Sequence, residues 1–303
     1  MNCDEFPRSA FGLPAPAKLN LFLHVIGRRP DGKHLLQSVF TLVDLADSID
    51  IVVRCDGAIL RTGDCLCEPE NDLCVRAARA LRQAALESER LAAQRPRIQS
   101  LGAEICVKKR IPAGAGMGGG SSDAATTLVA LNRLWSLGLS AGELAQIGET
   151  IGADVPFFIH GRTGFVEGIG ERFSPFEIPE ARYEIIWPGK GVSTAEIFAS
   201  PSLTRDHQVD KITFFSDRFR SCWPAIPGCN DLEPVARSIE PAVGAASALL
   251  ESVGLAPRMT GSGSAVFAVS TNGSPSLDEK LLPAGWLHFS VRGLAEHPLA
   301  AWM

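Results

Sequence analysis

The chain has 303 residues, enough for about two domains, and 46% of them are hydrophobic, which excludes a wholly disordered protein. The formal net charge is −5, from 29 basic and 34 acidic residues. This balance argues against a dedicated nucleic-acid binder, because phosphate neutralisation needs a basic surface, but it leaves room for a local basic patch around a small phosphorylated ligand.

The first nine residues are polar and mixed in charge, so no secretory signal is expected, and no segment approaches the ~18 apolar residues of a membrane span. We therefore expect a cytoplasmic protein with no membrane partner. Eight cysteines in such a protein are expected to be reduced thiols. Cys55, Cys65, Cys67 and Cys74 lie close together, but their spacing fits neither paired C-x-x-C knuckles nor a Cys/His finger, so no metal-ligand set is predicted.

The first half of the chain alternates strands and helices. Residues 15–26 are predicted to form a strand, with Leu19, Leu21, Leu23 and Val25 on one face and Lys18, Asn20 and His24 on the other. After a turn at 30–32, we expect a second strand over 35–53, a helix over 73–90 capped by Asn71 or Asp72, and a strand over 103–111. A helix over 122–135 follows, and then a helix that begins with a capping box of Ser140 and Glu143 and ends at Gly152.

The pattern changes after residue 160. A strand and turn are expected over 164–170, a helix around 235–252, and a glycine turn over 260–264 that leads into a strand over 265–269. The mixture predicts an α+β fold with two domains, residues 1–164 and residues 165–303.

A glycine-rich loop separates the predicted strand over 103–111 from the next helix. Five of the seven residues 114–120 are glycine, and Lys108, Lys109 and Arg110 precede the loop. Glycine lets the backbone approach a ligand and turn its N–H groups inward, and the N-terminus of a helix favours an anion. The loop therefore predicts a phosphate-binding site, whereas a plain turn would need only one or two glycines.

Other glycine-rich nucleotide loops fit less well. Gly114, Gly116 and Gly119 satisfy G-x-G-x-x-G, but a dinucleotide domain would need an apolar strand before the loop and an acidic residue ~20 residues later. A Walker loop needs lysine after its last glycine, where Ser121 stands, and the protein-kinase motifs H-R-D and D-F-G are absent.

Three segments resemble the conserved motifs of the GHMP kinases: residues 14–21, residues 112–122 and residues 259–267. Within that superfamily, residues 17–21, 31–34, 152–158 and 167–171 are most similar to the 4-diphosphocytidyl-2-C-methyl-D-erythritol kinase family. The resemblance implies a ribosomal protein S5 domain 2-like N-terminal domain and a ferredoxin-like C-terminal domain, with the active site in the cleft between them. It also implies a transferase of the non-mevalonate isoprenoid pathway that phosphorylates the 2-hydroxyl of its cytidine diphosphate-linked substrate.

The resemblance also implies a role for individual residues. Lys18 and Asp154 match the catalytic pair, with Asp154 as general base and Lys18 as its partner. ATP is the expected phosphate donor, together with Mg²⁺, for which Ser121 is the best protein ligand on offer; the protein is expected to be a monomer or a homodimer. Matched ATP-binding positions are Asn71, Lys109, Pro112, Ala113, Gly114, Ala115, Gly116, Met117, Gly118, Gly119, Gly120, Ser121 and Ser122, and matched substrate-binding positions are Asn20, Lys33, His34, Thr194 and Phe198.

Two positions depart from the family pattern. Lys33 stands where the family usually has a tyrosine that stacks on cytosine, and a lysine cannot stack as an aromatic ring does. Ala113 and Ala115 stand in a loop that often carries Met and Gly, so Ala115 is expected to avoid a positive φ. Lys33 keeps open the alternative of another GHMP small-molecule kinase. Two further alternatives are an NAD-dependent oxidoreductase built on the glycine motif and a nucleotide-binding protein without catalysis.

Overall fold

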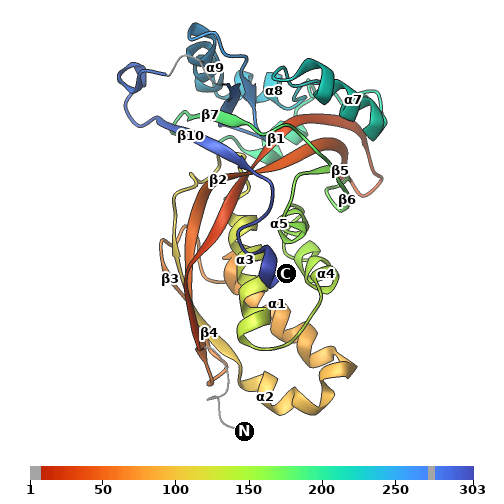
Figure 1. Ribbon diagram of the computed structural model, residues 1–303, viewed down its shortest axis with the longest axis vertical. Helices are drawn as coiled ribbons and strands as arrows, with labels where there is room; N and C mark the ends of the chain where they lie inside the picture. Colours follow the sequence, from red (N-terminus) through yellow and green to blue (C-terminus); the bar gives the residue numbers. More distant parts are fainter. Residues whose placement is uncertain (1–7, 272–276) are drawn as a thin grey trace.

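The computed structural model describes residues 8–271 and 277–303 of the chain. Two long antiparallel strands, β1 (Ser9–Arg28) and β2 (His34–Arg54), run along the length of the molecule (Figure 1). Both strands are far longer than the usual five or six residues. Each one therefore contributes to the lower and to the upper part of the molecule in this view.

In the lower part, β3 (Ile59–Gly63) and β4 (Gly102–Lys108) extend the sheet from the edge of β2. Helices cover one face of this sheet (Figure 1). They are α1 (Leu73–Glu87), α2 (Arg95–Ser100), α3 (Gly119–Leu134), α4 (Ala141–Glu149) and α5 (Val155–His160), with a 3₁₀ turn over Glu89–Gln94.

The upper part continues the same sheet in the order β2-β10-β7-β9-β8. Its strands are β5 (Gly164–Gly168), β6 (Arg172–Pro175), β7 (Arg182–Trp187), β8 (Arg258–Met259), β9 (Val266–Ser270) and β10 (Leu287–Leu294). Its helices are α6 (Thr194–Ala199), α7 (Ile212–Cys222), α8 (Glu233–Ile239) and α9 (Ala242–Ser252). Two 3₁₀ turns lie at Glu279–Leu281 and Ala300–Trp302, and the C-terminus lies beside α3 (Figure 1).

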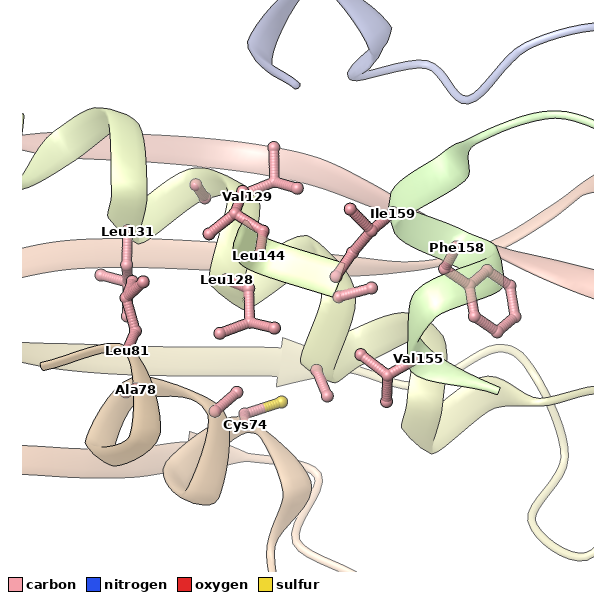
Figure 2. Close-up of a cluster of buried hydrophobic side chains, with 14 of the residues drawn as sticks. Cys74, Ala78, Leu81, Leu128, Val129, Leu131, Leu144, Val155, Phe158 and Ile159 are labelled. Carbon is pink, nitrogen blue, oxygen red and sulfur yellow. The ribbon is translucent and has the colours of Figure 1, made fainter. Parts of the chain in front are cut away.

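The largest apolar cluster lies between the lower sheet and its helices (Figure 2). Helix α3 is at its centre and buries Leu128, Val129 and Leu131, while α1 contributes Ala78 and Leu81. Because α3 is almost wholly buried, the glycine loop that leads into it is fixed to a rigid support.

The predicted elements are confirmed with some changes in their ends. Asp72, and not Asn71, caps α1 by accepting hydrogen bonds from the N–H groups of Cys74 and Val75, and the capping box of Ser140 and Glu143 is present. The strand over 103–111 ends at Lys108, and α3 begins at Gly119 instead of Ser122. The single helix expected around 235–252 is wrong: Pro241 interrupts it and separates α8 from α9.

The expected faces of β1 are wrong beyond Asn20. Asn20 pairs with Phe40, but Phe22 pairs with Val39, so Leu21 is an extra residue in the strand. Such a bulge shifts the alternation of side chains by one position. His24 therefore lies on the opposite face of β1 from Lys18 and Asn20, and its ring contacts Phe22, with 4.7 Å between ring centroids.

The cysteines also differ from expectation at one position. Cys55 is disulfide-bonded, so the prediction of eight reduced thiols is wrong there. The free cysteines among the described residues are Cys65, Cys67, Cys74, Cys106, Cys222 and Cys229. Within residues 8–271 and 277–303, no helix combines the length and apolar character needed to cross a membrane.

Truncation of Leu128 tests the role of α3 as a support. The Leu128 side chain is fully buried between α3 and its neighbours (Figure 2). We expect Leu128→Ala to lower the free energy of unfolding by about 2–5 kcal/mol, measured by urea denaturation. The exposed Val52→Ala is the control, and an equal loss in both variants would contradict the assignment of the core.

Candidate active site

The glycine-rich loop alternates between left-handed and ordinary backbone conformations. Gly114, Gly116 and Gly118 have φ values of +66°, +75° and +71°. In the described part of the chain, Ser136 is the only non-glycine residue with a positive φ. Ala115 therefore has a negative φ, as expected. Gly119 and Gly120 form the first turn of α3. Three of the five glycines are therefore required by backbone conformation.

A second glycine turn packs directly against this loop. A Cβ atom on Gly116 would lie 2.2 Å from the carbonyl oxygen of Thr260 and 2.8 Å from the nitrogen of Gly263. The N–H groups of Ser264 and Ala265 donate to the carbonyls of Gly114 and Ala115, at 3.2 and 3.1 Å. Gly116 and Thr260 are 144 residues apart in sequence, yet the two glycine motifs form one layer in which side chains have no room.

Lys18 lies beneath the loop. Its backbone N–H donates to the carbonyl of Met117 at 3.0 Å, and a Cβ atom on Gly118 would be 3.1 Å from Lys18 Cγ. The side chain is 5% exposed. Its position is thus set by β1 on one side and by the start of α3 on the other.

The buried ammonium of Lys18 has three partners. Nζ lies 3.5 Å from Asp154 Oδ2, donates a hydrogen bond to Asn20 Oδ1, and is 4.4 Å from the centroid of the Phe40 ring. Burial lowers the pKa of Lys18 below its usual value, while Asp154 acts in the opposite direction and favours the charged form. The ion pair with Asp154 therefore stabilises the positive charge on Lys18, which burial alone would disfavour.

Asp154 occupies the N-cap position of α5, followed by Pro156 at the start of the helix. Its carboxylate makes no capping hydrogen bond to the backbone and is 31% exposed. The group is consequently held by the helix start and by Lys18, and it keeps an oxygen available to solvent or to a ligand. This is the geometry that a general base requires.

Asn20 connects the lysine to the second glycine turn. Its backbone N–H donates to the hydroxyl oxygen of Thr260 at 2.9 Å, and its side-chain amide donates to Ser38 Oγ at 3.1 Å. These bonds fix the amide oxygen toward Lys18 Nζ. The predicted residues Lys18, Asn20 and Asp154 are therefore brought together as one polar cluster.

A cavity of about 430 Å³ opens on the outer side of the loop. Its walls come from the start of α1, the loop itself, the start of α6 and the second glycine turn. Of the predicted residues it is lined by Asn71, Lys109, Pro112, Ala113, Gly114, Ala115, Gly116, Met117, Gly118, Gly119, Gly120, Ser121 and Thr194.

Lys109 is held at the wall of this cavity by two carboxylates. Its Nζ lies 2.5 Å from Asp47 Oδ2 and 2.7 Å from Asp123 Oδ2. Burial acts to lower the pKa of Lys109, but Asp123 and Asp47 outweigh it and raise this pKa. Asp47 also accepts from the N–H groups of Arg110 and Ile111. The cluster fixes the chain at the entrance to the glycine loop.

The two serines after the glycines differ in their surroundings. The hydroxyl of Ser122 is buried and donates to the carbonyl of Pro16 at 2.7 Å, so it ties α3 to β1. Ser121 lines the cavity. Of the two, only Ser121 presents a hydroxyl to a ligand in this arrangement.

The remaining predicted residues lie apart from the cavity. The rings of His34 and Phe198 stack with 4.7 Å between centroids, and Arg205 Nε donates to His34 Nε2 at 3.2 Å. Burial, followed by Arg205, lowers the pKa of His34. Lys33 is exposed beside this pair, with its backbone N–H bonded to Asp31.

Sequence reasoning missed several residues that hold the site together. Thr260 lies in a motif that the sequence had singled out, but nothing in its local pattern indicates a bond to a residue 240 positions away. Arg205, Asp47 and Asp123 carry no motif at all. Their roles depend on tertiary contacts with His34 and Lys109.

Comparison with known proteins identifies the family. Residues 72–162 match the GHMP kinases N terminal domain. A curated protein of Paracidovorax citrulli named 4-diphosphocytidyl-2-C-methyl-D-erythritol kinase is 49% identical over 97% of this chain and 98% of its own length. A protein of the same name from Azoarcus is 48% identical over 95% of each chain.

Solved structures agree with these relatives. A crystal structure of 4-(cytidine 5'-diphospho)-2C-methyl-D-erythritol kinase, 31% identical, superposes with a TM-score of 0.71 over 94% of this chain and 99% of the other. A mevalonate kinase structure shares the fold at 15% identity, with a TM-score of 0.66 over 95% and 100% of the two chains. The expected fold is therefore confirmed, and the NAD-dependent alternative is wrong. The chain belongs to the GHMP kinases and, within them, to the 4-diphosphocytidyl-2-C-methyl-D-erythritol kinase family.

Proposed function

We propose that this kinase transfers the γ-phosphoryl group of ATP to the 2-hydroxyl of 4-diphosphocytidyl-2-C-methyl-D-erythritol. The observation that carries the proposal is the Lys18–Asp154 pair, 3.5 Å between Nζ and Oδ2, which lies directly under the glycine loop. The names of the relatives supply the substrate. We also propose that the chain forms two domains, residues 1–164 and residues 165–303, with the active site at their junction.

Asp154 accepts the proton of the substrate hydroxyl in this mechanism. The new bond forms between that oxygen and the γ-phosphorus as the bond to the β-phosphate bridging oxygen breaks, so ADP leaves with the electron pair. Lys18 orients the Asp154 carboxylate through their ion pair and stabilises negative charge on the attacking oxygen. Asn20 orients the Lys18 ammonium through its side-chain oxygen.

The phosphates of ATP occupy the glycine loop. The absence of Cβ atoms at Gly114, Gly116 and Gly118 allows close approach of the backbone, and the N-terminus of α3 favours negative charge. Asn71, Lys109 and Thr194 line the same cavity and would surround the rest of the nucleotide. Lys109 acts mainly by fixing the chain, because Asp47 and Asp123 already neutralise its charge.

The residues beside the loop fit a magnesium ion that accompanies ATP. Asp123 Oδ1 is buried without a hydrogen-bond partner in the described part of the chain, and Asp123 and Ser121 both line the cavity. Oxygen atoms are the ligands that Mg²⁺ prefers, so Ser121 and Asp123 are the residues that would hold it. The ion would neutralise charge on the phosphates during transfer.

The cytosine of the substrate binds at the pair of His34 and Phe198. Both rings present faces that a pyrimidine can stack on, and Arg205 fixes the orientation of His34. Since Lys33 replaces the tyrosine usual in the family, it contributes a charge at this edge instead of a ring.

Asp154→Asn tests the function and the general base together. Incubation of the wild-type protein with ATP and 4-diphosphocytidyl-2-C-methyl-D-erythritol should yield ADP and a phosphorylated product. Asp154→Asn should reduce kcat by about 10²–10⁴-fold, because the amide cannot accept the proton. Glu149→Gln, which removes an exposed carboxylate on α4, should leave kcat unchanged.

A folded Asp154→Asn variant with full turnover would refute the assignment of Asp154 as general base. Wild-type turnover of mevalonate or homoserine, and not of the cytidine substrate, would refute the proposed substrate.

The pH profile tests Lys18. Because burial lowers the pKa of Lys18, its ammonium loses a proton at a lower pH than an ordinary lysine side chain does. We expect kcat/KM to fall along an alkaline limb as this proton is lost, and Lys18→Arg, if it folds and retains activity, to move the limb to higher pH. If the alkaline limb lies at the same pH in Lys18→Arg as in the wild type, the limb reports the titration of another group.

Phe198→Ala tests the pyrimidine site. Loss of the stacking ring should raise the KM for the cytidine substrate about tenfold, since stacking on an aromatic side chain contributes about 1–3 kcal/mol, while the KM for ATP stays close to that of the wild type. Phe214→Ala, which removes a partly exposed ring on α7, is the control. An unchanged substrate KM in Phe198→Ala, or the absence of competitive inhibition by cytidine diphosphate against the substrate, would place cytosine elsewhere.

A further inference from the structure

A second cluster of ligating side chains lies on the face of β1 opposite Lys18 and Asn20. It consists of His24 on β1, His207 in the segment before α7, and Cys229 and Asp231 in the segment before α8. One potential metal-ligand atom from each of His24, His207 and Cys229 lies within 4.8 Å of the others. Among the residues that the structure describes, no other group of three or more His, Cys, Asp or Glu side chains brings its ligand atoms this close together.

Asp231 lies outside this group of three but contacts two of its members, so it is the candidate for a fourth ligand. Both of its carboxylate oxygens lie 3.1 Å from His207 Nδ1, and its Oδ1 lies 3.3 Å from Cys229 Sγ. Two imidazoles, one thiol and one carboxylate form a set that Zn²⁺ prefers, and four ligands complete its usual tetrahedron. Two nitrogen donors and one sulfur donor exclude Mg²⁺ and Ca²⁺ as the natural occupants, because these ions prefer oxygen ligands.

Backbone hydrogen bonds bring the three segments together. Leu23 N–H donates to Cys229 O and Asp231 N–H donates to Leu23 O, each at 2.9 Å. Val25 N–H donates to Asp231 Oδ2 at 2.7 Å, and His207 N–H donates to Val25 O at 3.1 Å. The ligands are thus held near one another by contacts that require no metal.

His24 provides an independent indication of a ligand. Its side chain is 2% exposed, and its Nδ1 is buried without a hydrogen-bond partner, while Nε2 accepts from the Cys229 N–H at 3.3 Å. Buried polar atoms are normally satisfied, so an unpartnered nitrogen calls for an explanation. The His24 and His207 rings stack with 3.5 Å between centroids, so the two imidazoles lie directly against each other.

We propose that His24, His207, Cys229 and Asp231 bind Zn²⁺. Binding forms a Zn–S bond as the Cys229 thiol gives its proton to solvent, and the ion then carries two positive charges against the thiolate and the carboxylate. Asp210 adds a further negative charge near His24. The nearby positive charge of Arg258 is directed toward backbone carbonyls, among them those of Leu21 and Gly228.

Coordination requires small movements that the cluster allows. The side chain of His207 is 27% exposed and can turn out of the ring stack, and Cys229 lies in an exposed segment. The segment that carries His207 also carries Arg205, which bonds to His34. The zinc therefore acts as a structural clamp that ties residues 203–211 to β1, away from the reacting groups.

Metal titration of the full-length protein tests the proposal. Zn²⁺ added to metal-free protein should bind at one equivalent and raise Tm, because a ligand of the folded state stabilises it. Co²⁺ should give a thiolate charge-transfer absorption. Cys229→Ser should abolish that absorption, and Cys229→Ser and His207→Gln should each weaken Zn²⁺ binding about tenfold or more.

Two exposed thiols elsewhere serve as matched controls. Cys222→Ser and Cys65→Ser remove free cysteines outside the cluster and should leave the affinity, the absorption and the rise in Tm unchanged. Absence of one-equivalent binding in the wild type, or equal loss in Cys222→Ser or Cys65→Ser, would overturn the site. These readouts do not use turnover, so they stand apart from the kinase assay.

Discussion

The candidate active site depends on the burial of one positive charge. Removing an ammonium from water is costly unless a counter-charge and hydrogen bonds replace the lost solvent. For Lys18 these are Asp154, Asn20 and the face of Phe40, and each comes from a different element: α5, β1 and β2. The same arrangement that makes the charge tolerable fixes the carboxylate beside it, so the stability of the pair and its proposed chemistry have one physical origin.

The glycines complete this arrangement. At Gly116 the carbonyl of Thr260 occupies the space that a Cβ atom would need, and at Gly118 the stem of Lys18 and the ring of Phe158 do so. Two turns from distant parts of the sequence can therefore meet over the lysine. The result is a bare backbone surface on one side of the loop and an ion pair on the other, and we propose these as neighbouring sites for the phosphates and for the acceptor hydroxyl.

Much of this could be predicted from sequence because the signals are local. The glycine loop, the capping box at Ser140 and the ordinary φ of Ala115 follow from turn chemistry and steric limits within a few residues. The extra residue at Leu21 could not, because apolar residues before and after it hide the change of face, and the prediction for His24 failed for that reason. The contacts of Arg205 with His34 and of Asp47 with Lys109 also could not be predicted from sequence, because each depends on how elements far apart in the chain pack together.

A double-mutant cycle on Lys18 and Asp154 tests the central claim most directly. The measurement is kcat for Lys18→Met, Asp154→Asn and the double variant, each shown to be folded. If the two side chains act as one unit, the double variant loses about as much activity as the more damaged single variant. Losses that multiply, so that the free-energy costs simply add, would contradict the account by showing that the two residues act independently.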